Sequence, residues 1–216
     1  MGRVLEELLQ LLSLETVGDD VFLGQSQDLG WGRVYGGQVL GQALSAGERT
    51  VEPKRLVHSL HAYFLRPGDP GQPVEYLVER TREGRSFTTR RIRAEQGGRP
   101  IFFMAASFQI HEAGLEHQDA MPEVPDPDSL ASSTDLILQH ADRLPAAVVD
   151  WARMDFPIEL RPVAIGDPMN PVPSKPVQHV WMRAESELPD GPALHRYLLA
   201  YASDLVLLDT ALLPHG

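Results

Sequence analysis

The stretch GGQVLGQALSAGERTV, residues 36–51, decides the fold of this chain. It has the length of a helix but little side-chain bulk, because glycine and alanine recur along it. A glycine inside a helix costs about 1 kcal/mol relative to alanine. Such a helix is favoured where another element must lie very close to it. We therefore expect a sheet wrapped around residues 36–51.

The segments after this helix predict the strands of that sheet. Four runs rich in apolar, β-branched and aromatic residues are separated by turn signals, at 56–65, 74–83, 86–96 and 101–110. The last run, IFFMAASFQI, is apolar on both faces and predicts a central, buried strand. An amphipathic helix over residues 3–13 and a short strand over 21–26 are predicted before the glycine-rich helix.

A second unit is predicted to repeat this order of elements. A bridging segment, 111–157, contains a predicted helix over 129–142 and separates a first domain, 1–110, from a second, 158–216. The second domain has predicted strands at 158–165 and 178–185, and then a closing helix over 193–212. Only the first helix is followed by strands, so we expect the second domain to be incomplete. By analogy with the first unit, roughly 60–80 further residues would complete it. The fold class is predicted to be α+β.

The composition excludes several classes of protein. The chain has 216 residues, 43% of them hydrophobic, and no cysteine, so disulfides and thiolate sites are excluded. A net charge of −11 argues against binding to nucleic acid. No uninterrupted apolar run has the roughly 18 residues of a membrane span, and the N-terminus lacks the pattern of a signal peptide. The prediction is a soluble, cytoplasmic protein with no membrane and no nucleic-acid partner.

The closing segment YLLAYASDLVLLDTALLPHG, residues 197–216, contains one carboxylate in an apolar setting, Asp204. At about 100° per residue, a continuous helix would place it on one face with Tyr197, Tyr201, Leu208 and Ala211. No lysine or arginine lies three or four residues away, so desolvation would raise the pKa of Asp204. Proteins tolerate such a group mostly where it acts in function, although a hydrogen bond to neighbouring backbone would also explain it. Asp209 points about 140° away and is predicted to be solvated.

Several motifs together resemble the acyl-CoA thioesterase II family. They are YGGQVLGQAL, RLVHSLHAYFLRPGD, GRSFTTRR, GRPIFFMAASFQ, EHQ and YLLAYASDLVLL…LLPHG, and they occur in order over essentially the whole chain. The resemblance implies a double hotdog, in which each unit is an antiparallel sheet wrapped around a long helix. It also implies hydrolysis of fatty acyl-CoA to free acid and CoA, in lipid and fatty acid metabolism, without a cofactor.

The resemblance further implies a catalytic set of an Asp on the second hotdog helix, a Thr or Ser, and a Gln, which together position a water. The Asp matches Asp204, and the other two are expected beyond Gly216. The sequence contains no GxSxG motif, so a serine-hydrolase mechanism lacks its signature. A carboxylate that acts on water is the natural substitute.

Residues 80–99 contain seven of the 19 basic residues of the chain. Guanidinium groups suit phosphate, so this stretch is a candidate site for the CoA phosphates, with Arg85 at a turn. The alternative is a set of exposed strand residues that balance nearby glutamates. The N–H groups at the start of the glycine-rich helix could polarise a thioester carbonyl, or the glycines could serve only for packing. The predicted substrate-binding residues are Gly36, Gly37, Arg85, Ser86 and Arg90.

His58 and His61 are predicted to lie on opposite faces of a strand, which makes them a poor metal pair, and no metal is expected. A buried, hydrogen-bonded His58 is favoured over a catalytic base. Two other functions remain open. One is a hotdog enoyl-CoA hydratase, although the His with Asp or Glu typical of those enzymes is not found here. The other is a non-catalytic acyl-CoA-binding protein. A homo-oligomer is expected because hotdog sheets commonly pair.

Overall fold

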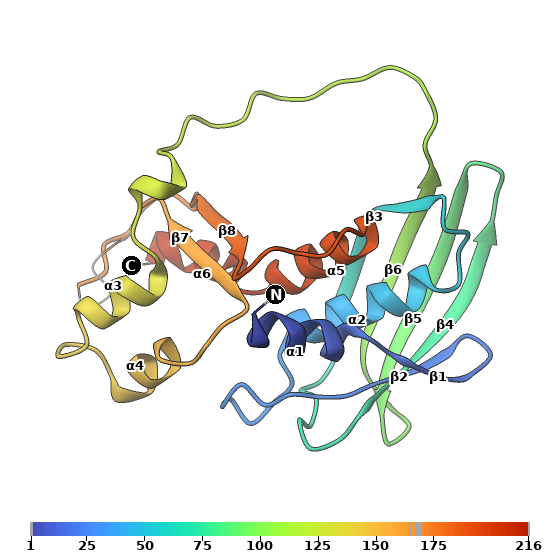
Figure 1. Ribbon diagram of the computed structural model, residues 1–216, viewed down its shortest axis with the longest axis horizontal. Coiled ribbons are helices and arrows are strands. Elements are labelled where there is room, and N and C mark those ends of the chain that lie inside the picture. Colours follow the sequence, from blue (N-terminus) through green and yellow to red (C-terminus); the bar gives the residue numbers. More distant parts are fainter. Residues whose placement is uncertain (1, 165, 167–169, 216) are drawn as a thin grey trace. The chain divides into compact units, whose positions relative to one another are not determined.

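A computed structural model describes residues 2–164, 166 and 170–215 of the chain (Figure 1). The helices are α1 (Arg3–Leu12), α2 (Gly36–Glu48), α3 (Ser133–Gln139), α4 (Ala146–Ala152), α5 (Pro192–Ala202) and α6 (Leu207–Leu212), with short 3₁₀ turns at Pro127–Ser129 and Leu213–His215. The strands are β1 (Glu15–Gly18), β2 (Val21–Gly24), β3 (Arg55–Phe64), β4 (Val74–Glu83), β5 (Phe87–Gln96), β6 (Arg99–Ile110), β7 (Ile158–Pro162) and β8 (Val180–Ala184).

The described residues form two compact units. The first, called the sheet unit, consists of residues 7–115 and 190–204. The second, called the hairpin unit, contains the remaining described residues. The domain boundaries 1–110, 111–157 and 158–216 follow chain order and stay a prediction. Compactness groups the chain in another way, because α5 packs on α2 within the sheet unit.

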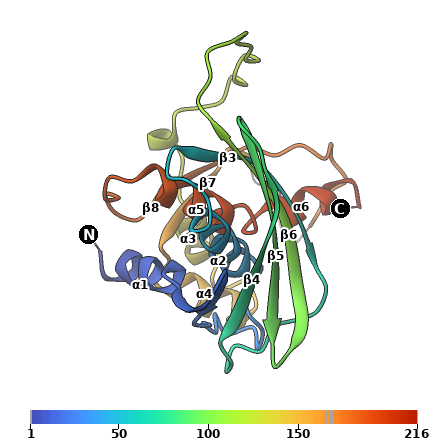
Figure 2. The same ribbon diagram turned by 90° about the vertical axis from the view of Figure 1, so that its right-hand side faces the viewer.

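The sheet unit contains a six-stranded antiparallel sheet within the described residues. The strand order is β1-β2-β4-β5-β6-β3, so β3 is an edge strand and β6 lies between β5 and β3. Figure 2 shows α2 alongside one face of this sheet. The core between them includes Leu44 and Ala46 of α2, and Ile92, Met104 and Phe108 of the sheet, all at most 1% exposed. The predicted sheet around the glycine-rich helix is confirmed.

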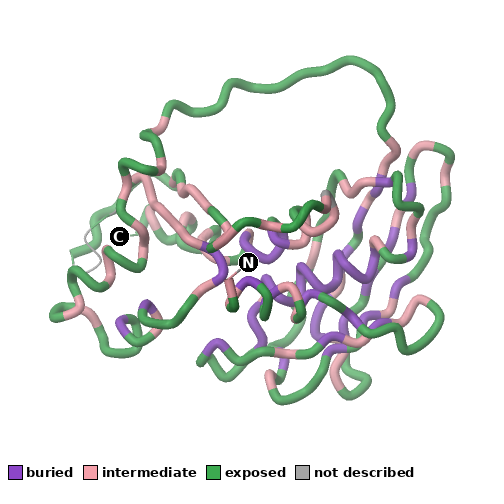
Figure 3. Tube along the Cα trace, viewed as in Figure 1, coloured by how far each residue is buried: buried purple, intermediate pink, exposed green. Residues whose placement is uncertain are grey.

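The middle of α2 is buried on all sides, including its polar residues, as Figure 3 shows. Gln42 donates to the carbonyls of Leu11 and Gln25 and accepts a hydrogen bond of 2.6 Å from the Tyr76 hydroxyl. The Gln38 side chain donates to the Gln25 carbonyl and to Gln42. Because buried amides need partners, these bonds fix the rotation of α2 against the strands around it.

The glycines of α2 make room mainly for α5 rather than for the sheet. A Cβ atom built at Gly37 would lie 2.2 Å from the Tyr201 carbonyl oxygen, and one at Gly41 would lie 3.2 Å from the Tyr197 carbonyl oxygen. Two glycines face the sheet in this way: a Cβ atom at Gly47 would lie 3.2 Å from Ile92, and one at Gly36 would lie 2.9 Å from the Phe64 ring on β3. The close approach was predicted correctly, but the element that approaches most closely is another helix.

The prediction of one continuous closing helix over 193–212 is wrong, because two helices cover this range. α5 ends at Ala202, residues 203–206 form a turn, and α6 begins at Leu207. The Ser203 side chain donates to the Ala200 carbonyl at 2.8 Å, and its N–H donates to the Leu199 carbonyl. Serine competes with the backbone in this way and favours helix ends. The predicted shared face of Asp204 with Leu208 and Ala211 therefore does not form.

Smaller differences concern elements with weak periodicity. Strand β1 and helix α4 were not predicted, and α3 covers only part of the predicted helix 129–142. β6 is interior, as predicted, but only one of its faces is buried, since Ala105 is exposed. Residues 111–123 are exposed throughout (Figure 3).

In the hairpin unit, β7 and β8 form a two-stranded antiparallel sheet within the described residues, with Leu160 opposite Met182. A helical stretch at the end of the chain, Ala193–His215, has 23 residues and is apolar enough to cross a membrane by length and composition alone. This finding corrects the sequence-based prediction that no apolar stretch is long enough to span a membrane. The turn at 203–206 interrupts the stretch, and its α5 part packs on α2.

Candidate active site

Asp204 lies at the N-terminus of α2. Its carboxylate accepts a hydrogen bond from the backbone N–H of Gly37, in the first turn of that helix. A Cβ atom at Gly36 would lie 2.5 Å from Asp204 Oδ2, so only glycine lets the carboxylate approach so closely. Helix N-termini carry unpaired N–H groups and a partial positive charge that favour an anion. The structure thus brings together Gly36, Gly37 and Asp204, three of the predicted site residues.

The environment of Asp204 differs in one respect from the prediction. The residue is exposed, not buried. Neighbouring groups nevertheless desolvate the carboxylate enough to raise its pKa, and the Gly37 N–H opposes this rise only in part. Among the described residues, no ion pair to Asp204 is found. An acid with a raised pKa and no cation is suited to accept a proton from water.

Tyr35, the residue before α2, holds the end of α5 in place. Its hydroxyl donates to the Tyr201 carbonyl at 2.8 Å, and the two rings meet edge to face with centroids 5.0 Å apart. The carbonyl of Tyr201 is among the last four of α5, which have no partner inside the helix. Asp204 follows three residues later, so this bond helps to place its carboxylate. A tyrosine before a helix has no characteristic signal in a sequence, so this role of Tyr35 was not predicted.

The predicted phosphate contacts lie near the other end of α2. The Arg55 side chain, at the start of β3, donates to the Gly84 and Arg85 carbonyls in the β4–β5 turn. Thr50, just after α2, accepts from Arg90 Nε at 2.6 Å. A helix of 13 residues is about 20 Å long. The two groups of predicted substrate-binding residues are therefore separated by roughly the length of α2.

Arg90 is a structural residue rather than a surface contact for phosphate, which corrects the prediction for this position. It is completely buried, and it donates to the Thr50 hydroxyl, the Thr50 carbonyl and the carboxylate of Glu83. Arg85 is exposed at the turn, and Ser86 donates to Glu112 at 2.9 Å. Nothing in the structure assigns a ligand to Arg85 or Ser86, and their role stays a prediction.

The histidines are arranged differently from the prediction. A bulge between Val57 and Ser59 adds one residue to β3 and changes the alternation of its side chains. His58 bonds Ser107 at 2.8 Å on the outer face of the sheet, the face on which His61 also lies beside Tyr63. His58 is hydrogen-bonded, as expected, but exposed. Within the described part of the chain, no group of three or more His, Cys, Asp or Glu could hold a metal ion.

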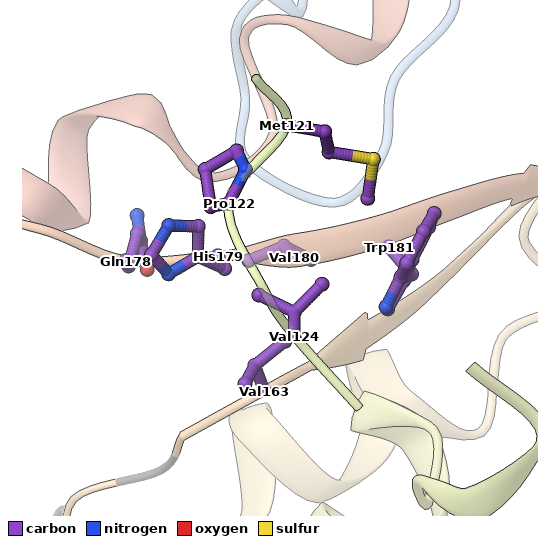
Figure 4. Close-up of a pocket in the computed structure, with 8 residues that line it drawn as sticks. All are labelled: Met121, Pro122, Val124, Val163, Gln178, His179, Val180 and Trp181. Carbon is purple, nitrogen blue, oxygen red and sulfur yellow. The ribbon is translucent and has the colours of Figure 1, made fainter. Parts of the chain in front are cut away.

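A cavity of about 300 Å³ in the hairpin unit is a second candidate site (Figure 4). Its lining is mostly apolar, with Met121, Val124, Val163 and Trp181, and its polar side chains include Gln178 and His179. The Trp181 indole N–H donates to the Pro125 carbonyl and is therefore satisfied. No carboxylate lines this cavity, so it lacks the acid that the chemistry at Asp204 requires.

Comparison with known proteins agrees with this fold. The acyl-CoA thioesterase N-terminal domain matches residues 26–109, and a second acyl-CoA thioesterase domain matches residues 150–216. Acyl-CoA thioesterase 2 of Haemophilus influenzae is 39% identical over 215 residues, which cover 100% of this chain and 75% of that protein.

Two solved structures extend the comparison to three dimensions. The acyl-CoA thioesterase II TesB2 from Mycobacterium marinum has a TM-score of 0.73 and 38% identity, over 97% of this chain and 71% of that one. A protein of unknown function with a hot dog fold from Alicyclobacillus acidocaldarius has a TM-score of 0.69 and 21% identity. The match covers 92% of this chain and 68% of that one. The latter likeness shows the fold alone.

The fold and the site define an α+β protein of the double hotdog class, with a carboxylate at the N-terminus of its central helix. The matches over both parts of the chain then give the family. This chain belongs to the acyl-CoA thioesterase II family.

Proposed function

We propose that this chain hydrolyses acyl-CoA thioesters to a free acid and CoA, and that Asp204 positions the attacking water. Family membership supports the reaction. The hydrogen bond from the Gly37 N–H to the Asp204 carboxylate supports the mechanism. That bond aims one oxygen at the helix and holds the acid beside a positive helix end.

The chemistry uses both partners of this pair. Asp204 accepts a proton from water while the water oxygen attacks the thioester carbonyl carbon. The carbonyl oxygen becomes negative, and the N-terminus of α2 stabilises that charge through its dipole and N–H groups. The C–S bond then breaks, and the CoA thiolate leaves with the proton. The raised pKa of Asp204 makes this carboxylate a better base than an ordinary, fully solvated aspartate.

The resemblance implies two further catalytic residues, a Thr or Ser and a Gln, and no residue of this chain is assigned to either role. Asp204 is thus the carboxylate member of a larger catalytic set. Its contribution can be measured separately because its only named hydrogen-bond partner in the described chain is backbone.

Release of CoA from palmitoyl-CoA, followed with a thiol reagent, tests the reaction. Wild type and an Asp209→Asn control, changed at an exposed acid of α6, should both release CoA and free palmitate. Asp204→Asn should lose most of this activity. Binding of palmitoyl-CoA by the wild type without release of CoA would instead identify an acyl-CoA-binding protein. Addition of water to an enoyl-CoA, with the thioester intact, would identify a hydratase.

Labelled water tests the role given to Asp204. In a single turnover with excess enzyme in H₂¹⁸O, direct attack by water places one ¹⁸O in the product acid. A covalent anhydride with Asp204, opened by water at the aspartyl carbon, would leave the acid unlabelled and ¹⁸O in the protein. Unlabelled acid in the first turnover would contradict the general-base mechanism.

The protein is further proposed to act in the cytoplasm as a homo-oligomer, without a membrane or nucleic-acid partner. The net charge of −11 supports the absence of a nucleic-acid partner. Sedimentation of the purified protein measures the oligomeric state. Cell fractionation tests the compartment and would reveal membrane attachment through residues 193–215.

A further inference from the structure

Three residues of β3 face the same side of the sheet as its buried core. Leu60 is opposite Ala106, Ala62 opposite Met104, and Phe64 opposite Phe102 in the pairing of β3 with β6. These three partners on β6 are at most 1% exposed. We call Leu60, Ala62 and Phe64 the β3 strip.

The β3 strip is apolar but only partly covered. Leu60 is 38% and Phe64 is 53% exposed, while Ala62, between them, packs on the core. β3 is an edge strand of the sheet within the described residues, so only β6 pairs with it there. Transfer of apolar surface out of water is favourable, so the strip favours an apolar occupant.

The strip begins beside the proposed catalytic acid. A Cβ atom built at Gly36 would lie 2.9 Å from Cε1 and Cζ of Phe64 and 2.5 Å from Asp204 Oδ2. The ring edge and the carboxylate therefore flank the same point at the start of α2. A molecule held with its reactive carbonyl near Asp204 would touch Phe64 with its next atoms.

The strip continues along α2 toward the other end of that helix. Val57, earlier on β3, pairs with Phe108, whose ring lies near Gly47 at the end of α2. Phe64 and Leu60 are four residues apart on the strand, a span of about 13 Å. Their side chains carry no polar atom, so they suit an alkyl chain.

We propose that the β3 strip carries the acyl chain of the substrate and that Phe64 is a specificity-determining residue. This inference rests on the proposed function. The acyl chain extends from the thioester carbonyl at Asp204 across the Phe64 ring. Only a long acyl chain reaches Leu60. The CoA arm then leaves Asp204 in another direction, away from Arg85.

Phe64→Ala tests the proposal, with Tyr63→Ala as a matched control. Tyr63 is the neighbouring residue and is equally exposed, at 52%, but it points to the outer face, where its ring stacks on Phe103. kcat/KM is measured for acetyl-, butanoyl-, octanoyl- and palmitoyl-CoA. Each buried CH₂ contributes about 0.8 kcal/mol, or roughly fourfold. Phe64→Ala should lower kcat/KM about tenfold for octanoyl- and palmitoyl-CoA and less than threefold for acetyl-CoA. Tyr63→Ala should preserve the wild-type profile.

Leu60→Ala gives a second, distal measurement. It should lower kcat/KM for palmitoyl-CoA and leave butanoyl-CoA unchanged, because a short chain ends before this residue. An equal loss at every chain length for Phe64→Ala, or the same profile for Tyr63→Ala, would overturn the proposal. If the wild type releases no CoA from any substrate, the proposed function fails instead, which is a distinct outcome.

Arg85→Ala decides between the strip and the phosphate site predicted from the sequence. The two lie in the same direction from Asp204, so the acyl chain and the nucleotide cannot both extend that way. We expect KM for palmitoyl-CoA to remain within twofold of wild type, the change expected from an exposed residue outside the site. A rise in KM for acyl-CoA, with none for acyl-pantetheine, would place the nucleotide near Arg85 and contradict the acyl chain on β3.

Discussion

The two ends of α2 each hold a charged side chain, and the protein treats them in opposite ways. Just after the C-terminal end, the Arg90 guanidinium is completely buried and donates to Thr50 and Glu83. At the N-terminal end, the Asp204 carboxylate is exposed, has a raised pKa, and has the Gly37 N–H as its named hydrogen-bond partner. A charge with a full set of partners stabilises structure, whereas a charge with few partners stays available for chemistry.

Asp204→Asn should give the largest effect and tests this contrast most directly. A general base contributes typically 10²–10⁴-fold, so kcat for palmitoyl-CoA should fall by about that factor. Stability should not fall at neutral pH. A carboxyl group whose pKa is raised by folding opposes folding when it is charged, and asparagine removes that charge.

Urea unfolding and steady-state kinetics on the same preparations measure the two quantities. Asp209→Asn, on α6, serves as the control for the loss of one exposed acid. A loss of stability with a kcat within threefold of wild type would assign Asp204 a structural role, and the contrast between the helix ends would fail.

Gly37→Ala should be the next largest effect, because it changes the packing of α2 against α5. Helix propensity alone predicts that alanine stabilises α2 by about 1 kcal/mol. The new methyl group, however, would lie 2.2 Å from the Tyr201 carbonyl and 2.4 Å from the Tyr35 ring. Overpacking of this kind costs about 1–3 kcal/mol, and we expect a loss of stability together with reduced kcat.

Gly41→Ala is the matched control, because its methyl group would first meet the flexible end of Leu12, at 2.8 Å. It should cost less in the free energy of unfolding and leave kcat unchanged. If Gly37→Ala is as stable as wild type, the helices can separate at this point, and the close placement of Asp204 is not imposed by the glycine.

Arg90→Met should affect stability alone. The change leaves buried acceptors without donors, including the Thr50 carbonyl, and each lost partner of this kind costs about 1–3 kcal/mol. KM and kcat should stay near wild type. Arg91→Met is the control, since Arg91 is exposed on the outer face, over the Phe103 ring, and should change stability by about 0.5 kcal/mol or less. A normal stability but a raised KM for Arg90→Met would restore it as a substrate contact.

The pH dependence of kcat should be the mildest test, with about a tenfold change per pH unit below the relevant pKa. The base form of Asp204 is required, and its pKa is raised by desolvation. Activity should therefore fall as the pH drops through a pKa above the ordinary value of 3.8, while the fold persists. Circular dichroism over the same pH range separates loss of activity from unfolding. A profile that stays flat down to pH 4 would show that Asp204 is not the titrating base.

Local patterns in the sequence were enough to predict the sheet and to single out Asp204. Runs rich in apolar, β-branched and aromatic residues between turn signals predicted β3 to β6, and the low bulk of residues 36–51 predicted a closely packed helix. Asp204 was found because it is an acid in an apolar segment. The absence of lysine and arginine nearby in the sequence correctly predicted that the pKa of Asp204 is raised.

The tertiary structure decided where these groups meet and how much water reaches them. The sequence distance between Gly36 and Asp204 is 168 residues, and only the packing of α5 on α2 brings them together. Simple alternation placed His58 on the opposite face of β3 from His61, and a bulge at His58 puts both on the same face. One inserted residue moves the side chains before it to the other face of the sheet. Arg90 and Arg85 are equivalent in the sequence as surface cations. Arg90 is buried against Thr50 and is structural, whereas Arg85 stays exposed. The sequence does not separate them, since desolvation depends on neighbours that are distant in the chain.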